Sequence, residues 1–197
     1  MCGDSVIATQ ETFQFPDGGA IPTSPLQFKF EVISAKAACD LNLKWHSRFP
    51  NIHWSNVVRN KRYICFAAKF EGVYFAVAIW SSPIAGNRLK DGWLLLELRR
   101  MAICEQAPKN TASRMLSWMR KDISKRFPEI IRLISYQDTG VHLGTIYKAS
   151  GWKLINTMSK EVDWAVSGRI RNKPQSNAPK VRWELDLNTS QTLIGVR

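Results

Sequence analysis

Several segments of the chain alternate apolar and polar residues, or carry short unbroken apolar runs between turn residues. Alternation with a period of two is typical of a half-buried β-strand, and a short apolar run is typical of a strand buried on both faces. The pair Glu71-Gly72 between two such runs indicates a hairpin turn. Strands are therefore predicted over residues 28–32, 63–70, 73–80, 93–103, 130–137, 152–157 and 181–187.

Three other segments repeat their apolar residues with the period of an α-helix. Ser34 is the expected cap of a helix over residues 35–45, and Asn110 or Thr111 caps a second helix that ends at Pro128. The second helix has an apolar face and a basic opposite face. A third helix is expected over residues 141–150, stopped by Gly151. The order of strands and helices predicts a single α/β domain.

Positive charge exceeds negative charge by a formal +12 in this chain of 197 residues. Residues 99–132 hold nine Lys or Arg against three acids, and residues 141–180 hold seven against two. Most of the excess therefore lies in the C-terminal half, where it favours a polyanionic partner such as nucleic acid. The alternative is a solubilising basic surface.

The chain carries no signal for a membrane or a metal. No apolar run approaches the roughly 20 residues that cross a bilayer, and the first residues lack a secretory signal, so we expect a cytoplasmic protein without a membrane partner. The four cysteines form no C-x-x-C pair, and His46 and His53 have no third ligand nearby. No metal site is predicted.

Two local patterns accompany the predicted order of elements. The strand ending near residue 103 leads through a short turn into the basic helix, and residues 144–152 carry a tyrosine on a helix before a Gly-Trp pair. Together they resemble the GNAT acyltransferase fold over residues 26–187. The resemblance implies a mixed central sheet flanked by helices, with a basic loop over residues 160–180. Residues 1–25 are expected to form an arm, and residues 188–197 a tail.

The resemblance to GNAT proteins implies that acetyl-CoA, or a related acyl-CoA, binds at the start of the basic helix. The first turn of any helix offers unpaired backbone N–H groups and the positive end of the helix dipole, both of which favour phosphate. The chain departs from the family in this turn, because Pro108-Lys109-Asn110-Thr111 replaces the usual glycine-rich sequence.

A more specific similarity is carried by Leu98-Arg99-Arg100, by residues 108–114, by Ile134-Ser135-Tyr136-Gln137-Asp138 and by Gly144-Thr145-Ile146-Tyr147. These segments look similar to the Mom family, bacteriophage enzymes that place a carbamoylmethyl group on the exocyclic amine of adenine in DNA. The resemblance implies a DNA-modifying transferase that protects phage DNA from host restriction. Double-stranded DNA is the partner that it implies.

The resemblance makes Tyr147 the candidate general acid, because a departing thiolate needs a proton donor within hydrogen-bond reach. Asp138 follows a strand at its carboxyl end, where it could orient or deprotonate the adenine amine, and Tyr136 shares its face of the strand. A core tyrosine and a turn or helix-capping aspartate are the structural alternatives. The parity of the strand could also be reversed by a bulge.

Further residues are expected to bind cofactor, substrate or nucleic acid. The cofactor set is Arg100, Lys109, Asn110, Thr111, Ser113 and Arg114; the substrate set is Arg99, Ser135, His46, His53 and Trp54; the nucleic-acid set is Arg169, Arg171, Lys173 and Lys180.

Two other functions remain open at this point. One is a GNAT N-acetyltransferase that uses acetyl-CoA on a protein or small-molecule amine. The other is a non-catalytic nucleic-acid-binding module, in which Tyr147 and Asp138 have structural roles only.

Overall fold

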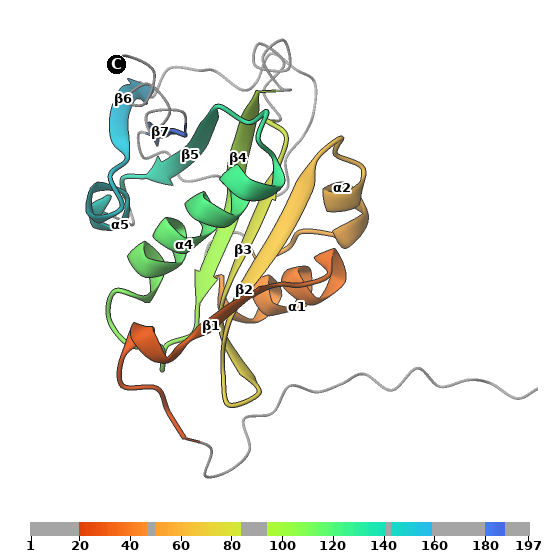
Figure 1. Ribbon diagram of the computed structural model, residues 1–197, viewed down its shortest axis with the longest axis vertical. Coiled ribbons are helices and arrows are strands. Elements are labelled where there is room, and N and C mark those ends of the chain that lie inside the picture. Colours follow the sequence, from red (N-terminus) through yellow and green to blue (C-terminus); the bar gives the residue numbers. More distant parts are fainter. Residues whose placement is uncertain (1–19, 47–49, 84–93, 141–142, 159–179, 188–197) are drawn as a thin grey trace, which may run out of the picture.

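The computed structural model describes residues 20–46, 50–83, 94–140, 143–158 and 180–187. In these residues seven strands form one sheet in the order β1-β2-β3-β4-β5-β7-β6 (Figure 1). Within it β4 and β5 pair in parallel, and the other neighbours pair antiparallel. The strands are β1 Lys29–Val32, β2 Tyr63–Phe70, β3 Val73–Ser81, β4 Leu95–Ile103, β5 Arg132–Asp138, β6 Lys153–Met158 and β7 Lys180–Asp186.

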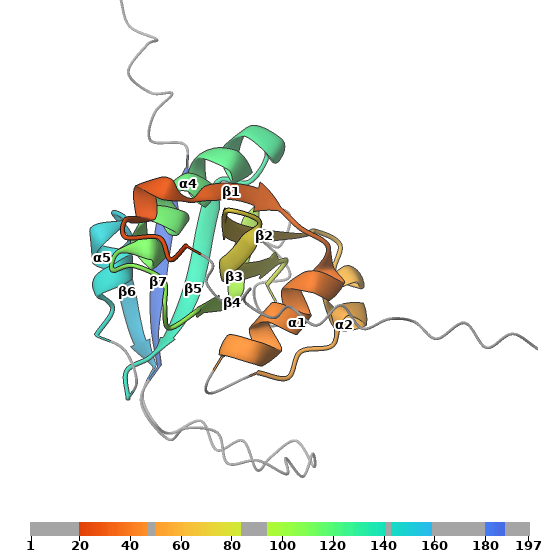
Figure 2. The same cartoon turned by 90° about the horizontal axis from the view of Figure 1, so that it is seen from below.

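Helices cover both faces of the sheet. On one side α1 (Ala35–Trp45) contacts β2, β3 and β4, and α2 (Trp54–Val58) packs beside α1. On the other side lie α4 (Thr111–Arg126) and α5 (Thr145–Ala149), as Figure 2 shows. The Ser34 hydroxyl accepts a hydrogen bond from the Ala37 N–H at 3.2 Å and so caps α1, as predicted.

The alternating strands supply two apolar cores, one for each face. Phe66, Trp80 and Leu96 point toward α4, whereas Cys65 and Ile79 point toward α1. Each fully buried side chain of this size contributes about 1.5–3 kcal/mol through removal of its surface from water. Burial also raises the pKa of the Cys65 thiol to about 12, which makes this cysteine a packing residue rather than a nucleophile.

Most of the predicted elements are confirmed, and the differences have local causes. The predicted third helix is too long at its start, because α5 begins only after Gly144, whose φ of 73° is incompatible with a continuing helix. Val141 and His142 lie outside the described residues. The short α2 was not predicted. No helix in the described ranges is long and apolar enough to span a bilayer.

Candidate active site

The two parallel strands separate halfway along their length. β4 and β5 pair from Leu95↔Arg132 to Leu98↔Ser135, after which each strand continues without the other (Figure 1). At the same point the pairing of β4 with β3 shifts by one residue. Arg99 therefore has no partner residue on β3 and forms a bulge between Leu98 and Arg100. Bulges of this kind redirect side chains and are common beside active sites. The unpaired edges of β4 and β5 therefore leave backbone groups for a ligand.

The turn before α4 takes the conformation that a glycine would provide. Asn110 has φ 68° and ψ 5°, in the left-handed region, and its side chain makes no capping hydrogen bond. Asparagine is one of the few residues other than glycine that tolerates this region. Asn110 thus adopts a conformation that glycine would otherwise provide. The Thr111 N–H donates to the Pro108 carbonyl at 3.3 Å, so the amides of Ala112 and Ser113 are the first-turn donors left for an anion.

The expected cofactor residues of this turn divide into two groups. The Thr111 hydroxyl donates to the Pro108 carbonyl at 2.6 Å, and the Ser113 hydroxyl donates to the Asn110 carbonyl at 3.1 Å. These hydroxyls hold the turn in shape. Lys109 and Arg114 are exposed beside it and add positive charge where phosphates would bind.

Arg99 and Arg100 are half-buried where β4 leaves β5. Arg99 donates from Nη1 to the Ser81 hydroxyl at 3.2 Å, and Arg100 donates from Nη1 to the Arg99 carbonyl at 2.6 Å. Burial lowers the pKa of both guanidinium groups, and the charge of buried Glu97 opposes this shift. Two poorly screened positive charges therefore lie at the separation of the strands.

Tyr147 is buried at the centre of an aromatic and polar cluster. Its hydroxyl lies 2.8 Å from the Ser135 hydroxyl, and its ring stacks on Trp183 with centroids 5.3 Å apart. Burial raises the pKa of Tyr147, while the hydrogen bond with Ser135 acts in the opposite direction. The phenol is therefore protonated at neutral pH and retains a proton that it can donate.

The start of α5 fits closely against this cluster. The Gln137 side-chain oxygen accepts a hydrogen bond from the Trp183 indole N–H at 2.6 Å, in the interior. A β-carbon added to Gly144 would lie 2.6 Å from that oxygen and 2.6 Å from a Trp183 ring carbon. Glycine at this position lets α5 approach β5 and β7.

Ser135 and Gln137 share the face of β5 that points toward Tyr147, so alternation places Tyr136 and Asp138 on the opposite face. This pairing of residues was predicted. One Asp138 oxygen, Oδ1, accepts a hydrogen bond from the Gly140 N–H at 2.9 Å, which is a turn role. The other, Oδ2, is buried and has no hydrogen-bond partner among the described residues. Asp138 thus retains an oxygen for a ligand.

The segment between α1 and α2 carries exposed aromatic side chains. His53 caps α2, since its Nδ1 accepts from the Ser55 N–H at 3.3 Å, and Trp54 is 44% exposed. Their ring centroids are 5.5 Å apart. His46 ends α1 and donates its N–H to the Asn42 carbonyl at 2.9 Å. The described residues hold no cluster of three His, Cys, Asp or Glu that could bind a metal.

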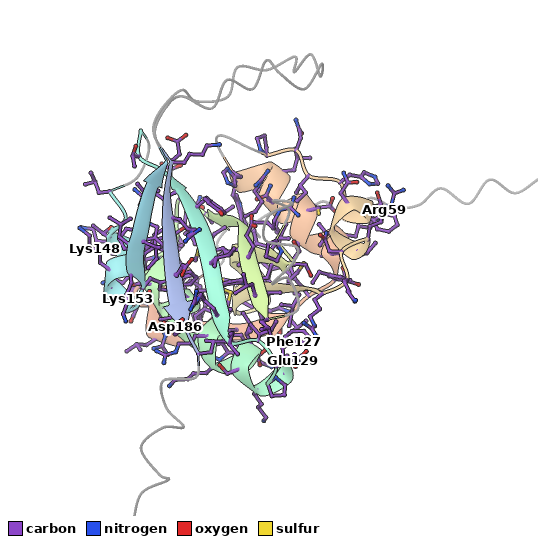
Figure 3. The ribbon with its side chains drawn as sticks, turned by 90° about the horizontal axis from the view of Figure 1, so that it is seen from above. Arg59, Phe127, Glu129, Lys148, Lys153 and Asp186 are labelled. Atoms are coloured by element: carbon purple, nitrogen blue, oxygen red, sulfur yellow. The ribbon has the colours of Figure 1, made fainter. Side chains whose placement is uncertain are left out.

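Of the residues expected to contact nucleic acid, only Lys180 is described. It begins β7 and pairs in register with Asp138. Arg169, Arg171 and Lys173 lie outside the described residues. Other basic side chains are spread around the fold: Figure 3 places Arg59, directly after α2, at one side of the sheet and Lys148 and Lys153 at the other.

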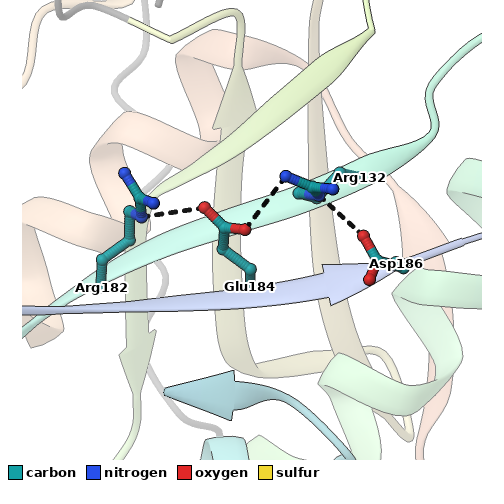
Figure 4. Close-up of polar contacts among 4 residues, drawn as sticks. All are labelled: Arg132, Arg182, Glu184 and Asp186. Carbon is teal, nitrogen blue, oxygen red and sulfur yellow. Dashed lines mark hydrogen bonds and ion pairs between the residues drawn. The ribbon is translucent and has the colours of Figure 1, made fainter. Parts of the chain in front are cut away.

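Four charged residues on β5 and β7 form a chain of ion pairs that was not predicted (Figure 4). Arg132 bonds Asp186 at 2.7 Å and contacts Glu184 at 3.2 Å, and Glu184 in turn contacts the Nε of Arg182 at 2.8 Å. The sequence signal for this chain of ion pairs is a charged residue at every second position, as in Arg182-x-Glu184-x-Asp186. Such residues share one face of a strand.

A seven-stranded sheet that opens between parallel β4 and β5, with α4 following β4, is the fold of the GNAT acyltransferases. Similar solved structures include the ribosomal-protein-S18-alanine N-acetyltransferase of Escherichia coli, at 12% identity and a TM-score of 0.58 over 86% of this chain and 99% of that one. A Bacillus subtilis acetyltransferase in complex with CoA shares 13% identity and a TM-score of 0.56 over 81% and 98%. A putative acetyltransferase of Salmonella typhimurium with acetyl-CoA shares 10% identity and a TM-score of 0.56 over 86% and 99%.

These likenesses establish the fold. The family is established by sequence: the Mom protein family model matches residues 27–186, and the chain belongs to that family. No curated protein matches the chain. The resemblance to Mom proteins and the GNAT fold expected from the sequence are both confirmed.

Proposed function

We propose that this protein is a DNA-modifying transferase that places a carbamoylmethyl-type group on the exocyclic amine of adenine in double-stranded DNA. The observation that carries the proposal is the arrangement around β5, in a chain of the Mom family: Tyr147 with Ser135 on one face, and Asp138 with Tyr136 on the other. Both faces meet at the strand edge that β4 leaves free. The modification would protect phage DNA from restriction in the cytoplasm of the host.

An acyl-coenzyme A fits the start of α4 through the amides of Ala112 and Ser113 and the charges of Lys109 and Arg114. Arg99 and Arg100 would add charge beside the strand opening. When bound, the group would supply a thioester carbonyl carbon and a thiolate as the departing group. Because a thioester contains no nitrogen, the amide of a carbamoylmethyl-type product would need an amine-containing co-substrate. Two of the similar solved structures contain CoA or acetyl-CoA.

The residues of this chain would then accept and donate protons and position the adenine amine. The adenine amine is a weak nucleophile, because its lone pair is delocalised into the ring, and it must lose a proton when the new bond to nitrogen forms. The partner-free Oδ2 of Asp138 is the proposed acceptor of that proton. The protonated phenol of Tyr147 is the proposed donor to the departing group.

An adenine in a duplex must leave the base stack to reach such a site. The exposed His53 and Trp54 rings offer a surface on which a displaced base could stack, and each stacked base is worth about 1–3 kcal/mol. We include Lys180 and the basic residues Arg169, Arg171 and Lys173 as contacts to the DNA backbone.

The test is mass spectrometry of nucleosides from cells that produce the wild-type protein, Asp138→Ala or Tyr147→Phe. We expect an altered deoxyadenosine with the wild type and a decrease of at least about 100-fold with each variant. Tyr63→Phe and Asp40→Asn, at exposed positions away from β5, are matched controls that should retain modification. Modification that persists in both site variants would refute the catalytic roles.

The GNAT fold favours a second candidate, an N-acetyltransferase that acts on a protein or small-molecule amine. Unmodified DNA together with newly acetylated proteins or amines in the same cells would support it over the first.

A further inference from the structure

Arg182 is held in place by other charged side chains. Its Nε contacts a Glu184 oxygen at 2.8 Å, and the second oxygen of that carboxylate contacts Arg132 at 3.2 Å. Arg132 is fixed in turn by Asp186 at 2.7 Å (Figure 4). The carboxylate of Glu184 is only 11% exposed, so its attraction for Arg182 is weakly screened by water. The ion pair therefore holds the guanidinium of Arg182 beside Glu184 before any ligand arrives.

The terminal nitrogens of this guanidinium are not used within the fold. Arg182 contacts Glu184 through Nε, and this contact is an ion pair without hydrogen-bond geometry. Among the described residues Nη1 and Nη2 take part in no ion pair. The side chain is 24% exposed although Nε itself is buried, so the exposed area lies elsewhere on the side chain. A preorganised guanidinium with two free N–H₂ groups is suited to bind an oxyanion such as phosphate at two points.

Arg182 faces the proposed acceptor side of the site. It pairs in register with Tyr136, and the next residue on the same face of β7, Lys180, pairs with Asp138. Directly opposed residues of antiparallel strands have β-carbons about 4.5–5.5 Å apart. Two cations of β7 thus lie beside the two residues of β5 that we assign to the adenine side.

The phosphates of coenzyme A have another place to bind. The start of α4 lies on the face of the sheet that holds Trp183, whereas Arg182 alternates with Trp183 and points to the opposite face. An anion bound by Arg182 therefore belongs to the acceptor. In a DNA substrate the anion is a backbone phosphate next to the modified nucleotide.

We propose that Arg182 binds a DNA phosphate beside the target adenosine, and that Glu184 is the positioning residue that aims its guanidinium. This inference rests on the proposed function. The substitution Glu184→Gln distinguishes positioning from general electrostatics, because it makes the protein more positive. General attraction to DNA would then increase the affinity, whereas a guanidinium of Arg182 that is no longer positioned would lower it.

The experiment measures binding of a fluorescein-labelled, adenine-containing duplex by anisotropy over a series of salt concentrations. Arg182→Gln is expected to weaken binding about tenfold and to reduce the slope of log affinity against log salt by about 0.9, the loss of one phosphate contact. Glu184→Gln should also weaken binding. Arg126→Gln removes the same charge from an exposed residue paired with Asp122 on α4, and should leave the affinity within about twofold.

Arg182→Lys retains the charge and protects the test against misfolding of the Gln variants. A lysine is a point charge without a planar fork, so we expect most of the salt slope to remain and the fraction of modified deoxyadenosine in cells to decrease. An unchanged affinity and slope in Arg182→Gln, or tighter binding in Glu184→Gln, would overturn the proposal. Weaker binding of coenzyme A by Arg182→Gln, measured by calorimetry with DNA binding unchanged, would also overturn it.

Failure of this inference and failure of the proposed function give different results. If the wild type modifies adenine and Arg182→Gln behaves like it, only the role of Arg182 is wrong. If the wild type neither binds the duplex nor alters deoxyadenosine, the proposed function is wrong.

Discussion

Replacement of Gly144 by alanine should separate the cost of backbone strain from the cost of a close contact. Gly144 has φ 73°, so alanine in the same conformation costs about 1 kcal/mol in the left-handed region. Its β-carbon would also lie 2.6 Å from the Gln137 oxygen and from a ring carbon of Trp183. Neither neighbour can move freely, because they share a buried hydrogen bond of 2.6 Å.

The second cost follows from breaking that hydrogen bond. A buried polar group left without its partner costs about 1–3 kcal/mol. We therefore expect Gly144→Ala to lower the free energy of unfolding by about 2–4 kcal/mol, a large part of the 5–15 kcal/mol that is typical of a domain. Since Trp183 stacks on Tyr147, the same displacement should disturb the contact of Tyr147 with Ser135 and reduce the proposed DNA modification.

Gly151→Ala is the matched control for this experiment. Gly151 has a similar φ of 78°, but a β-carbon there would meet nothing within 4 Å. It should therefore cost only the strain, about 1 kcal/mol. Urea denaturation monitored by tryptophan fluorescence measures both variants. Equal destabilisation by the two substitutions would refute the close approach of α5 to Gln137 and Trp183.

Further predictions concern Asn110, Glu71 and Tyr147. Asn110→Ala should lower the free energy of unfolding by about 1 kcal/mol and Asn110→Gly should not, because φ is 68°; urea denaturation of both checks this. Glu71→Asn should raise the melting temperature by a few degrees, since Glu71 has φ 46° in the first position of a two-residue hairpin turn that favours asparagine; an unchanged or lower melting temperature would contradict this. Burial raises the pKa of Tyr147 above its ordinary value of 10.0, so its contribution to stability is complete below pH 10 and is lost as pH rises through the folded-state pKa. The free energy of unfolding should therefore fall more steeply above pH 10 in the wild type than in Tyr147→Phe; parallel curves would count against a buried phenol.

The strands could be predicted because their burial is periodic or continuous along the chain. Tyr63–Phe70 and Val73–Ser81 are apolar runs around one turn, and their pairing is local. The face shared by Ser135 and Gln137 could also be predicted, because alternation alone decides it. The five residues of α2 are too few to show a helical period, so that helix left no comparable signal.

Other features depend on contacts that no local pattern contains. The left-handed turn at Asn110 follows from the path between β4 and α4, and the usual indicator, a glycine, is absent. The ion pairs of Arg132 with Glu184 and Asp186 join residues more than fifty positions apart in the chain. They form only because β7 lies beside β5 in the sheet, between β5 and β6. The roles assigned to Tyr147, Asp138 and the cofactor residues remain predictions that the variants above can test.

The arrangement of β5 connects the two proposed halves of the reaction. One face of the strand presents Ser135 to Tyr147, on the side of α4, and the other presents Asp138 beside Lys180 and Arg182. A donor held by α4 and an acceptor held by β7 would therefore approach the same strand from opposite faces. They can meet only where β4 no longer pairs with β5, beyond Leu98 and Ser135, because a paired strand would separate them. The point of strand separation is thus the position at which group transfer must occur if both assignments are correct.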